Sequence, residues 1–149
     1  AYFYPLDAIL EWNRAYGRRG FVQFQCVLPL ENSEAGLTAL LGAIGKAGSG
    51  SFLAVLKRFG AQGGMFSFPM PGYTLALDFP ANPANLALLH ELDAITIDHG
   101  GRFYLAKDAR MTPEILRASD TRVPDFIGKR SALNTDRAFR SAQSERLSL

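Results

Sequence analysis

The stretch "GFVQFQCVLP", residues 20–29, decides the fold because its side chains alternate strictly between two faces. One face would carry four apolar side chains: Val22, Phe24, Cys26 and Leu28. The other would carry two amides between two apolar side chains: Phe21, Gln23, Gln25 and Val27. A period of two indicates a β-strand, and Pro29 ends it because proline has no N–H to give to a neighbouring strand. We therefore expect a sheet with one buried face and one face that displays Gln23 and Gln25.

Two helices and three further strands are predicted after this strand. Helices are expected where leucine and isoleucine recur every three or four residues, and strands where short apolar runs end at glycine or proline. The expected elements are helix 31–50, strand 51–60, strand 73–80, helix 82–100 and strand 102–106, with a short helix at 5–17 before the first strand. Residues 61–72 hold too many glycines and prolines for regular structure throughout.

The order of these elements, β-α-β followed by β-α-β, favours a split β-α-β sandwich of the α+β class, also called ferredoxin-like. Right-handed crossovers place the two strands that flank each helix in parallel, with another strand between them, so the completed sheet is antiparallel. Both helices then cover the same face, and the other face stays open. We expect this domain to occupy residues 1–106.

The last part of the chain, residues 107–149, is expected to be a helical extension. Short helices are predicted at about 112–119, 124–133 and 141–147. Arginines alternate with aspartates and glutamates here, so this part is not a basic tail. Its helices are too weakly apolar to form a core of their own, so they should pack along the sandwich or on a domain outside this chain.

Composition excludes several kinds of function. A net charge of +2 over 149 residues leaves no electrostatic footprint for nucleic-acid binding, and no apolar run reaches the roughly 18 residues that a membrane span needs. Cys26 is the only cysteine, so there is no disulfide framework, and a cytoplasmic location is favoured. His90 and His99 are too far apart on one helix to form a metal pair, and no metal site is predicted.

The charged group "KDAR", residues 107–110, follows the last predicted strand and leaves two interpretations open. Lys107, Asp108 and Arg110 could form a solvated strand end, with a local ion pair that contributes less than about 1 kcal/mol. Lys107 could instead be a point charge held at a strand tip for an anion or a cofactor. Gln23 and Gln25 leave a similar choice, because they could bind a polar ligand or simply line an exposed sheet face.

Three segments occur in this order over nearly the whole chain: "YPLDAILEWNRAYGRRGFVQFQCVLPLE", "PMPGYTLALDFP" and "GGRFYLAKDARMT". Together they resemble FAD-linked oxidoreductases of the vanillyl-alcohol-oxidase type, in particular the decaprenylphosphoryl-ribose oxidase branch and its sugar-lactone oxidase relatives. The resemblance implies the substrate, or cap, domain of such an enzyme at 1–106, with a tail at 107–149 that returns to an N-terminal FAD-binding domain. The chain opens at Ala1 directly on aromatic residues and has no counterpart of the FAD-binding half, so we expect it to be part of a longer protein.

The same resemblance implies a role for particular residues. The implied substrate-binding residues are Gln23, Gln25, Tyr73, Thr74 and Ala76. Lys107 would lie beside flavin and substrate as a catalytic and cofactor-contacting residue, and Arg110 would be a second cofactor contact. The mycobacterial enzyme of this branch has asparagine and cysteine in place of Thr74 and Ala76, and this departure leaves the substrate open.

The implied function is FAD-dependent oxidation of a carbinol in a sugar-like or alcohol substrate, by hydride transfer to the flavin. FAD is not expected to stay on this chain, which should be inactive without the FAD-binding domain as its partner. Self-association of the isolated chain through exposed apolar surface, and a location of the full-length enzyme near a membrane, are further expectations. The alternative is a stand-alone ferredoxin-like module that binds a small ligand or regulates oligomerisation through its open sheet face.

Overall fold

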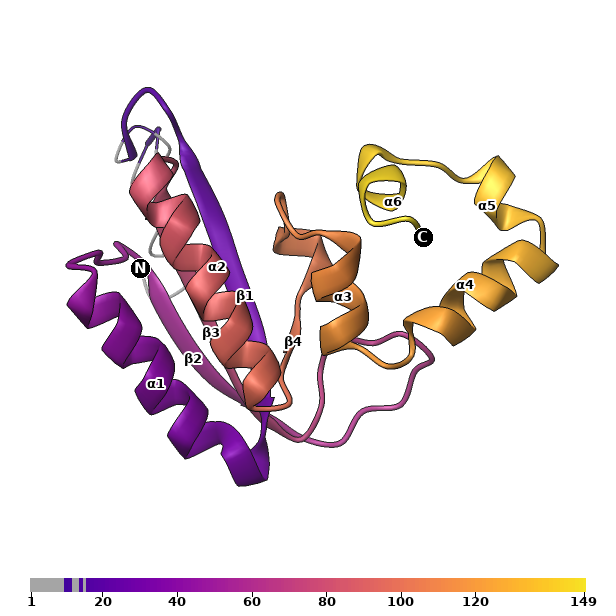
Figure 1. Cartoon of the computed structure of the whole chain (residues 1–149), viewed down its shortest axis with the longest axis horizontal. Coiled ribbons are helices and arrows are strands. Elements are labelled where there is room, and N and C mark those ends of the chain that lie inside the picture. The colour runs from indigo at the N-terminus through magenta and orange to yellow at the C-terminus, as the bar shows by residue number, and fades with distance from the viewer. Residues whose placement is uncertain (1–9, 12–13, 15) are drawn as a thin grey trace.

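A computed structural model describes the protein over residues 10–11, 14 and 16–149. Most of the short helix expected at 5–17 lies outside these residues. The sandwich consists of β1 (Phe21–Pro29), α1 (Ser33–Lys46), β2 (Ala54–Phe59), β3 (Gly72–Pro80), α2 (Pro83–Asp98) and β4 (Arg102–Phe103). Four shorter helices follow it: α3 (Pro113–Ser119), α4 (Val123–Ala132), α5 (Thr135–Ala138) and α6 (Ala142–Arg146) (Figure 1).

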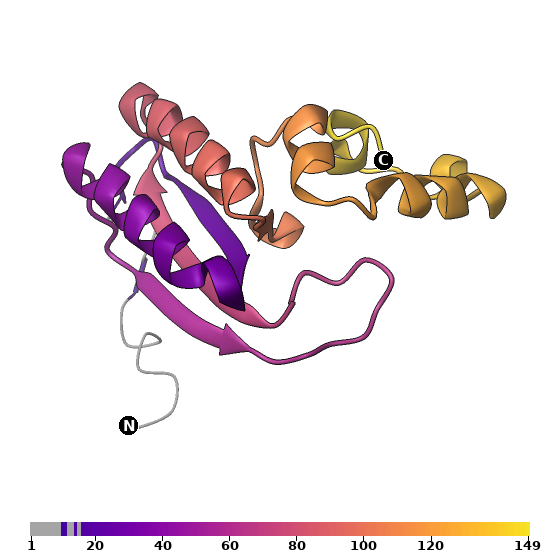
Figure 2. The ribbon, with the colours of Figure 1, turned by 60° about the horizontal axis from the view of Figure 1, so that its bottom comes forward.

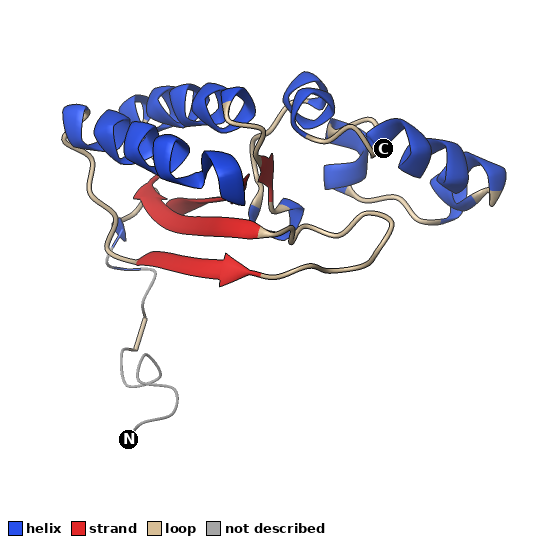
Figure 3. Ribbon diagram, turned by 90° about the horizontal axis from the view of Figure 1, so that it is seen from below, coloured by secondary structure: helices blue, strands red, loops and turns tan. Residues whose placement is uncertain are grey.

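The four strands form one antiparallel sheet in the order β2-β3-β1-β4. The central strands β1 and β3 pair along their whole length, from Phe21 opposite Pro80 to Pro29 opposite Gly72. Each long helix therefore connects two parallel strands that have another strand between them, which confirms the predicted split β-α-β order. Both helices, α1 and α2, lie together on one face of the sheet, as Figure 3 shows.

The covered face of the sheet meets α1 and α2 in the hydrophobic core. Five of the large, fully buried side chains come from the two central strands and the two helices: Leu28, Leu40, Phe79, Leu89 and Leu92. This is the face predicted from the alternation in β1, since Phe24 and Cys26 are buried in the same cluster. Burial raises the pKa of the Cys26 thiol to about 12, so this cysteine is an unreactive part of the core.

The helix α2 begins and ends at residues with clear local reasons. The Asn82 side chain accepts a hydrogen bond from the Asn85 backbone N–H at 2.9 Å, and Pro83 occupies the first turn. After the helix, Gly100 adopts a φ of +71°, which glycine takes without strain. At Gly101, a Cβ would lie 2.8 Å from the Val27 carbonyl oxygen. These two glycines let the chain turn directly from α2 into β4, beside β1.

The fourth strand is shorter than the predicted 102–106. Only Arg102–Phe103 pair with β1, and the chain then bends into a 3-10 turn, η4 (Leu105–Lys107). The Tyr104 N–H still donates to β1 at 2.9 Å, but the Lys107 N–H donates back to the Tyr104 carbonyl oxygen at 3.0 Å. This turn ends the strand and holds Lys107 at the edge of the sheet.

The C-terminal helices share the core of the sandwich only in part. The side chains that join the core cluster are Met111, Leu116, Val123 and Leu147. By contrast, Leu133 and Phe139 are each 73% exposed. The helix α3, the start of α4 and the end of α6 are therefore fixed to the sandwich, whereas α5 projects from it (Figure 1). Within the described residues, no helix combines the length and apolar character needed to cross a membrane.

Candidate functional site

The open face of the sheet brings together three of the residues predicted to bind substrate. In the register of β1 and β3, Gln25 lies opposite Ala76, and Val27 lies opposite Thr74. Gln25 Nε2 donates to Thr74 Oγ1 at 3.1 Å, and the Thr74 hydroxyl donates to the Cys26 carbonyl oxygen at 2.8 Å. Thr74 therefore fixes the orientation of the Gln25 amide, beside the small side chain of Ala76.

Gln23 lies on the same face but is bound to a different partner. Its Nε2 donates to Asp78 Oδ1 at 2.9 Å, and the Tyr16 hydroxyl donates to Asp78 Oδ2 at 3.1 Å. Asp78 is buried, and Tyr16 stacks on Phe21 with ring centroids 4.5 Å apart. The segment before β1 therefore closes this end of the open face, and the Gln23 amide nitrogen contributes to the closure.

Tyr73 is separated from the other predicted substrate residues. It lies opposite Leu28, whose side chain is in the core. Neighbouring residues of a strand point to opposite sides of the sheet, so Tyr73 and Thr74 point in opposite directions. Thr74 and Ala76 lie on the open face, so the structure does not bring Tyr73 to them although the three are close in sequence.

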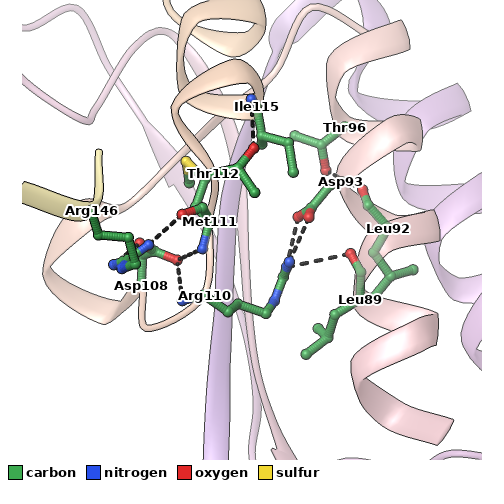
Figure 4. Close-up of polar contacts among 10 residues, drawn as sticks. All are labelled: Leu89, Leu92, Asp93, Thr96, Asp108, Arg110, Met111, Thr112, Ile115 and Arg146. Carbon is green, nitrogen blue, oxygen red and sulfur yellow. Dashed lines mark hydrogen bonds and ion pairs between the residues drawn. The ribbon is translucent and has the colours of Figure 1, made fainter. Parts of the chain in front are cut away.

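Arg110 is bound to α2, on the covered side of the sheet (Figure 4). Its two terminal nitrogens donate to the two carboxylate oxygens of Asp93 at 2.6 and 2.7 Å, and one of them also reaches the Leu89 carbonyl oxygen at 3.3 Å. Asp93 is 2% exposed, so this bidentate pair neutralises a buried carboxylate. The guanidinium thus has a structural partner, and the cofactor contact predicted for Arg110 stays a prediction.

Asp108 holds together the turn that follows Lys107 (Figure 4). Its Oδ1 accepts the backbone N–H groups of Arg110 at 3.0 Å and Met111 at 2.8 Å, and its Oδ2 accepts from the Arg146 guanidinium at 2.8 Å. Gln143 Nε2 also donates to the Leu105 carbonyl oxygen at 2.6 Å. The last helix, α6, is therefore tied to the turn around Lys107 by two side chains.

Lys107 differs from both charged neighbours because its ammonium group has no partner among the described residues. It is half-buried, and neither a hydrogen bond nor an ion pair joins its Nζ to any residue that the structure describes. It lines a groove of about 500 Å³ on the open face, which we call the open-face groove. The residues around the groove are Gln25, Lys57, Phe59, Gln62, Ser67, Phe68, Pro69, Tyr104 and Lys107.

Lys57 is a second amine in the open-face groove and was not among the predicted site residues. It lies opposite Thr74 in the register of β2 and β3, so it shares the face of Gln25 and Ala76. Its ammonium group also lacks a hydrogen bond or ion pair with any of the described side chains. The signal in the sequence is the alternation of Val55, Lys57 and Phe59, which puts the lysine between two apolar residues on one face.

The walls of the open-face groove are aromatic. The ring of Tyr104 stacks on that of Phe68 with centroids 4.8 Å apart, and Phe59 meets Phe68 edge to face at 5.8 Å. Two ammonium groups and an oriented amide between such walls suit a ligand with a flat ring and with hydroxyl or anionic oxygens. No cluster of three or more metal-ligating side chains occurs in the part of the chain that the structure describes.

Comparison with known proteins agrees with the resemblance described from the sequence. The chain is 39% identical over 149 residues to a decaprenylphosphoryl-β-D-ribose oxidase of Mycolicibacterium smegmatis, a match that covers 99% of the chain and 32% of that protein. It is 36% identical over 144 residues to an uncharacterized protein in the mprA 5' region of Streptomyces coelicolor, covering 95% of the chain and 39% of that protein. No protein-family model matches the chain. The chain spans about a third of the length of these curated relatives, and over that length it is a relative of decaprenylphosphoryl-β-D-ribose oxidase.

Proposed function

We propose that this chain is the substrate-binding part of a FAD-dependent oxidoreductase that oxidises a carbinol of a sugar-like or alcohol substrate. The sequence similarity to an oxidase supports the reaction class. The observation that carries the proposal is the ammonium group of Lys107, which has no partner in the described part of the chain and lies beside an oriented amide and two aromatic rings. In this proposal the rest of the longer protein supplies the FAD-binding domain, which is the partner of this chain.

The residues of the open-face groove fit one side of a flavin and a hydroxylated ligand. An ammonium group that no carboxylate neutralises is suited to a ring system that gains negative charge during a reaction, and Lys107 is such a group. FAD, when bound, supplies the redox chemistry by accepting the electrons from the carbinol. The amines and the amide of the groove would bind the substrate, orient it and supply positive charge.

Three residues of the open-face groove have distinct roles in this proposal. Gln25, whose amide nitrogen is held by Thr74 at 3.1 Å, presents its carbonyl oxygen as an acceptor for a substrate hydroxyl. Lys107 would stabilise negative charge that develops on a ring system bound beside it. Lys57 adds a second positive charge across the same groove and attracts anionic groups of the ligand. The cytoplasmic location expected from the lone Cys26 stays a prediction.

The test is the variant Lys107→Ala in the longer protein that contains this chain. We expect reduction of bound flavin by substrate to slow by about 100-fold, the usual effect of removing one preorganised charged or hydrogen-bonding group. Rapid-mixing absorbance at the flavin band gives this rate, and thermal unfolding gives the stability. The matched control is Lys129→Ala, which removes an exposed lysine of α4 outside the groove and should leave both values unchanged.

Two outcomes would overturn the assignment. If Lys107→Ala lowers the unfolding temperature as strongly as it lowers the rate of flavin reduction, Lys107 is a structural residue. If the purified 149-residue chain retains stoichiometric yellow flavin, the proposed division of labour between this chain and a separate FAD-binding domain is wrong. A stand-alone ligand-binding module would instead bind small ligands without any flavin in the preparation.

A further inference from the structure

The connection between β2 and β3 forms one wall of the open-face groove although it has no regular structure. Residues 60–71 leave the sheet and pass under the C-terminal helices before they return, as Figure 2 shows. Gln62, Ser67, Phe68 and Pro69 of this connection line the groove. A wall made of an irregular, glycine-rich segment needs fixed partners if it is to hold a ligand in one position.

Arg102 of β4 is the first such partner. Its Nε donates to the Phe68 carbonyl oxygen at 2.8 Å, and a terminal nitrogen donates to the Pro69 carbonyl oxygen at 2.7 Å. One planar guanidinium thus holds two consecutive peptide groups in a fixed orientation. Because Arg102 itself pairs with Val27 in the sheet, these bonds attach the connection to β4 and, through that pairing, to β1.

Arg122, immediately before α4, is the second partner. One of its terminal nitrogens donates to the Ser67 carbonyl oxygen at 2.9 Å, and its guanidinium carbon lies 5.4 Å from the centre of the Phe66 ring. Phe66 in turn stacks on Phe126 of α4 with centroids 4.5 Å apart. The carbonyl oxygens of three consecutive residues, 67 to 69, are therefore held by two arginines that come from different parts of the fold.

Asp120 orients Arg122. Its two carboxylate oxygens accept from Arg122 Nε at 2.8 Å and from a terminal nitrogen at 2.6 Å, and the Arg122 backbone N–H adds a third bond at 3.1 Å. Burial disfavours the charged carboxylate, but these hydrogen bonds and the charges of Arg122 and Arg102 outweigh it, so the pKa of Asp120 lies below its usual value. The carboxylate therefore stays ionised and keeps Arg122 pointed at the connection.

The position of Phe68 decides the shape of the open-face groove. Together with Tyr104, Phe68 also lines a smaller cavity of about 110 Å³ between the connection, η4 and α3, so this stacked pair separates two spaces. A shift of the peptide groups at 67 to 69 would move the ring and change both spaces together.

We propose that Arg102, Asp120 and Arg122 are positioning residues that fix the 67–69 segment and thereby set which ligands the open-face groove accepts. None of the three lines the open-face groove, so they act through Ser67, Phe68 and Pro69. The positioning of the segment stands on the contacts within this chain. Its effect on a substrate rests on the proposed function.

The first experiment tests the positioning alone, on the 149-residue chain. Limited chymotrypsin digestion reports how often the Phe66–Ser67 peptide becomes accessible. We expect Asp120→Asn and Arg102→Met each to speed this cleavage about tenfold. Arg102→Met removes both hydrogen bonds from Arg102 to the segment, and Asp120→Asn weakens the ion pair that keeps Arg122 on the Ser67 carbonyl oxygen. Glu145→Gln, which breaks the exposed Arg140–Glu145 pair in the same C-terminal part, is the matched control and should change nothing.

The cleavage result separates the proposal from general damage to the fold. Far-UV circular dichroism and the unfolding midpoint show whether Asp120→Asn is folded, and Arg102→Met gives a second variant that leaves the Asp120–Arg122 pair intact. Faster cleavage with a retained midpoint supports the positioning role. Cleavage at the rate of the Glu145→Gln control in both variants overturns it.

The second experiment tests the effect on the ligand, in the longer protein. We expect Arg102→Met and Asp120→Asn to raise KM for the substrate about tenfold while kcat changes less than about twofold, because loss of binding geometry outside the reacting groups acts mainly on KM. Arg102→Lys keeps the positive charge but not the forked guanidinium, so its KM should lie between that of the unchanged protein and that of Arg102→Met. An unchanged KM in variants with faster cleavage would overturn the effect on the groove. If Lys107→Ala loses activity and these variants do not, the proposed function stands and only the effect of the 67–69 segment on the groove is wrong. Failure of the inference can therefore be told apart from failure of the proposed function.

Discussion

The two faces of the sheet are built from the same strands, but one packs into the core and the other lines a groove. The covered face places Phe24, Leu28 and Phe79 in the hydrophobic core against two helices. The open face places Gln25, Thr74 and their neighbours beside a groove of about 500 Å³. Because side chains alternate along a strand, each residue contributes to one face only, so substitutions can address the two faces separately.

The charged residues after β4 repeat the same division over four positions. Arg110 forms an ion pair with Asp93 on the covered side of the sheet. Asp108 forms an ion pair with Arg146 in the turn that follows Lys107. Lys107 remains on the open side, and no residue that the structure describes pairs with it. The contrast teaches that a dense run of charge can hold both structural ion pairs and one free charge, and that substitution can tell them apart.

The largest effect should come from the core of the covered face. Phe79→Ala removes a fully buried ring and should cost about 3–5 kcal/mol of folding free energy, from lost burial and the cavity left behind. Urea unfolding followed by circular dichroism measures this cost. A loss below about 1 kcal/mol would mean that the covered face can collapse around the cavity, and the comparison between the faces would weaken.

The next effect concerns the structural charge. Arg110→Ala leaves the Asp93 carboxylate buried without a cation, and the Arg110 side chain is only 17% exposed, so we expect a loss of about 3 kcal/mol. Arg140→Ala, which breaks an exposed ion pair with Glu145, is the control and should cost less than about 0.5 kcal/mol. Equal losses in the two variants would contradict the structural role of Arg110 and restore interest in a cofactor contact.

The smallest effect on stability should come from the open face. Gln25→Ala removes one half-buried hydrogen bond to Thr74 and should cost less than about 1 kcal/mol. In the longer protein the same variant should weaken substrate binding several-fold, measured as KM under steady-state turnover. A stability loss as large as that of Phe79→Ala would show that the open face stabilises the fold as strongly as the covered face. It would contradict the proposed difference between the two faces.

The sequence predicted the fold well because the alternation in residues 20–29 and the repeated β-α-β order leave few topologies. The family resemblance grouped Tyr73 with Gln25, Thr74 and Ala76 as substrate residues. The register puts Tyr73 on the other side of the sheet from these three, and the binding role of all four stays a prediction. Lys57 was missed because the second strand was located without assigning its residues to faces.

The roles of the charges could not be read from local sequence. The partner of Arg110 is Asp93, 17 positions earlier, and the partner of Asp108 is Arg146, 38 positions later. Only the folded chain brings these groups together, so no pattern around residue 107 shows which charge will be left free. The same holds for the three residues that fix the 67–69 segment, since Arg102 and Arg122 meet it across the fold.

The position of β4 in the sheet also has a kinetic consequence. Val27 of β1 is opposite Arg102 of β4, so this pairing joins residues from the two ends of the sandwich sequence and closes the longest loop in the sheet. Contacts between residues so distant in sequence pay the largest loop-closure entropy and form late in folding. The strands β1 and β4 pair over only two residues. Tyr104 and Lys107 nevertheless reach the groove only after this pairing has formed. We therefore expect the binding surface to be completed in the last folding step, after most of the hydrophobic core has already formed.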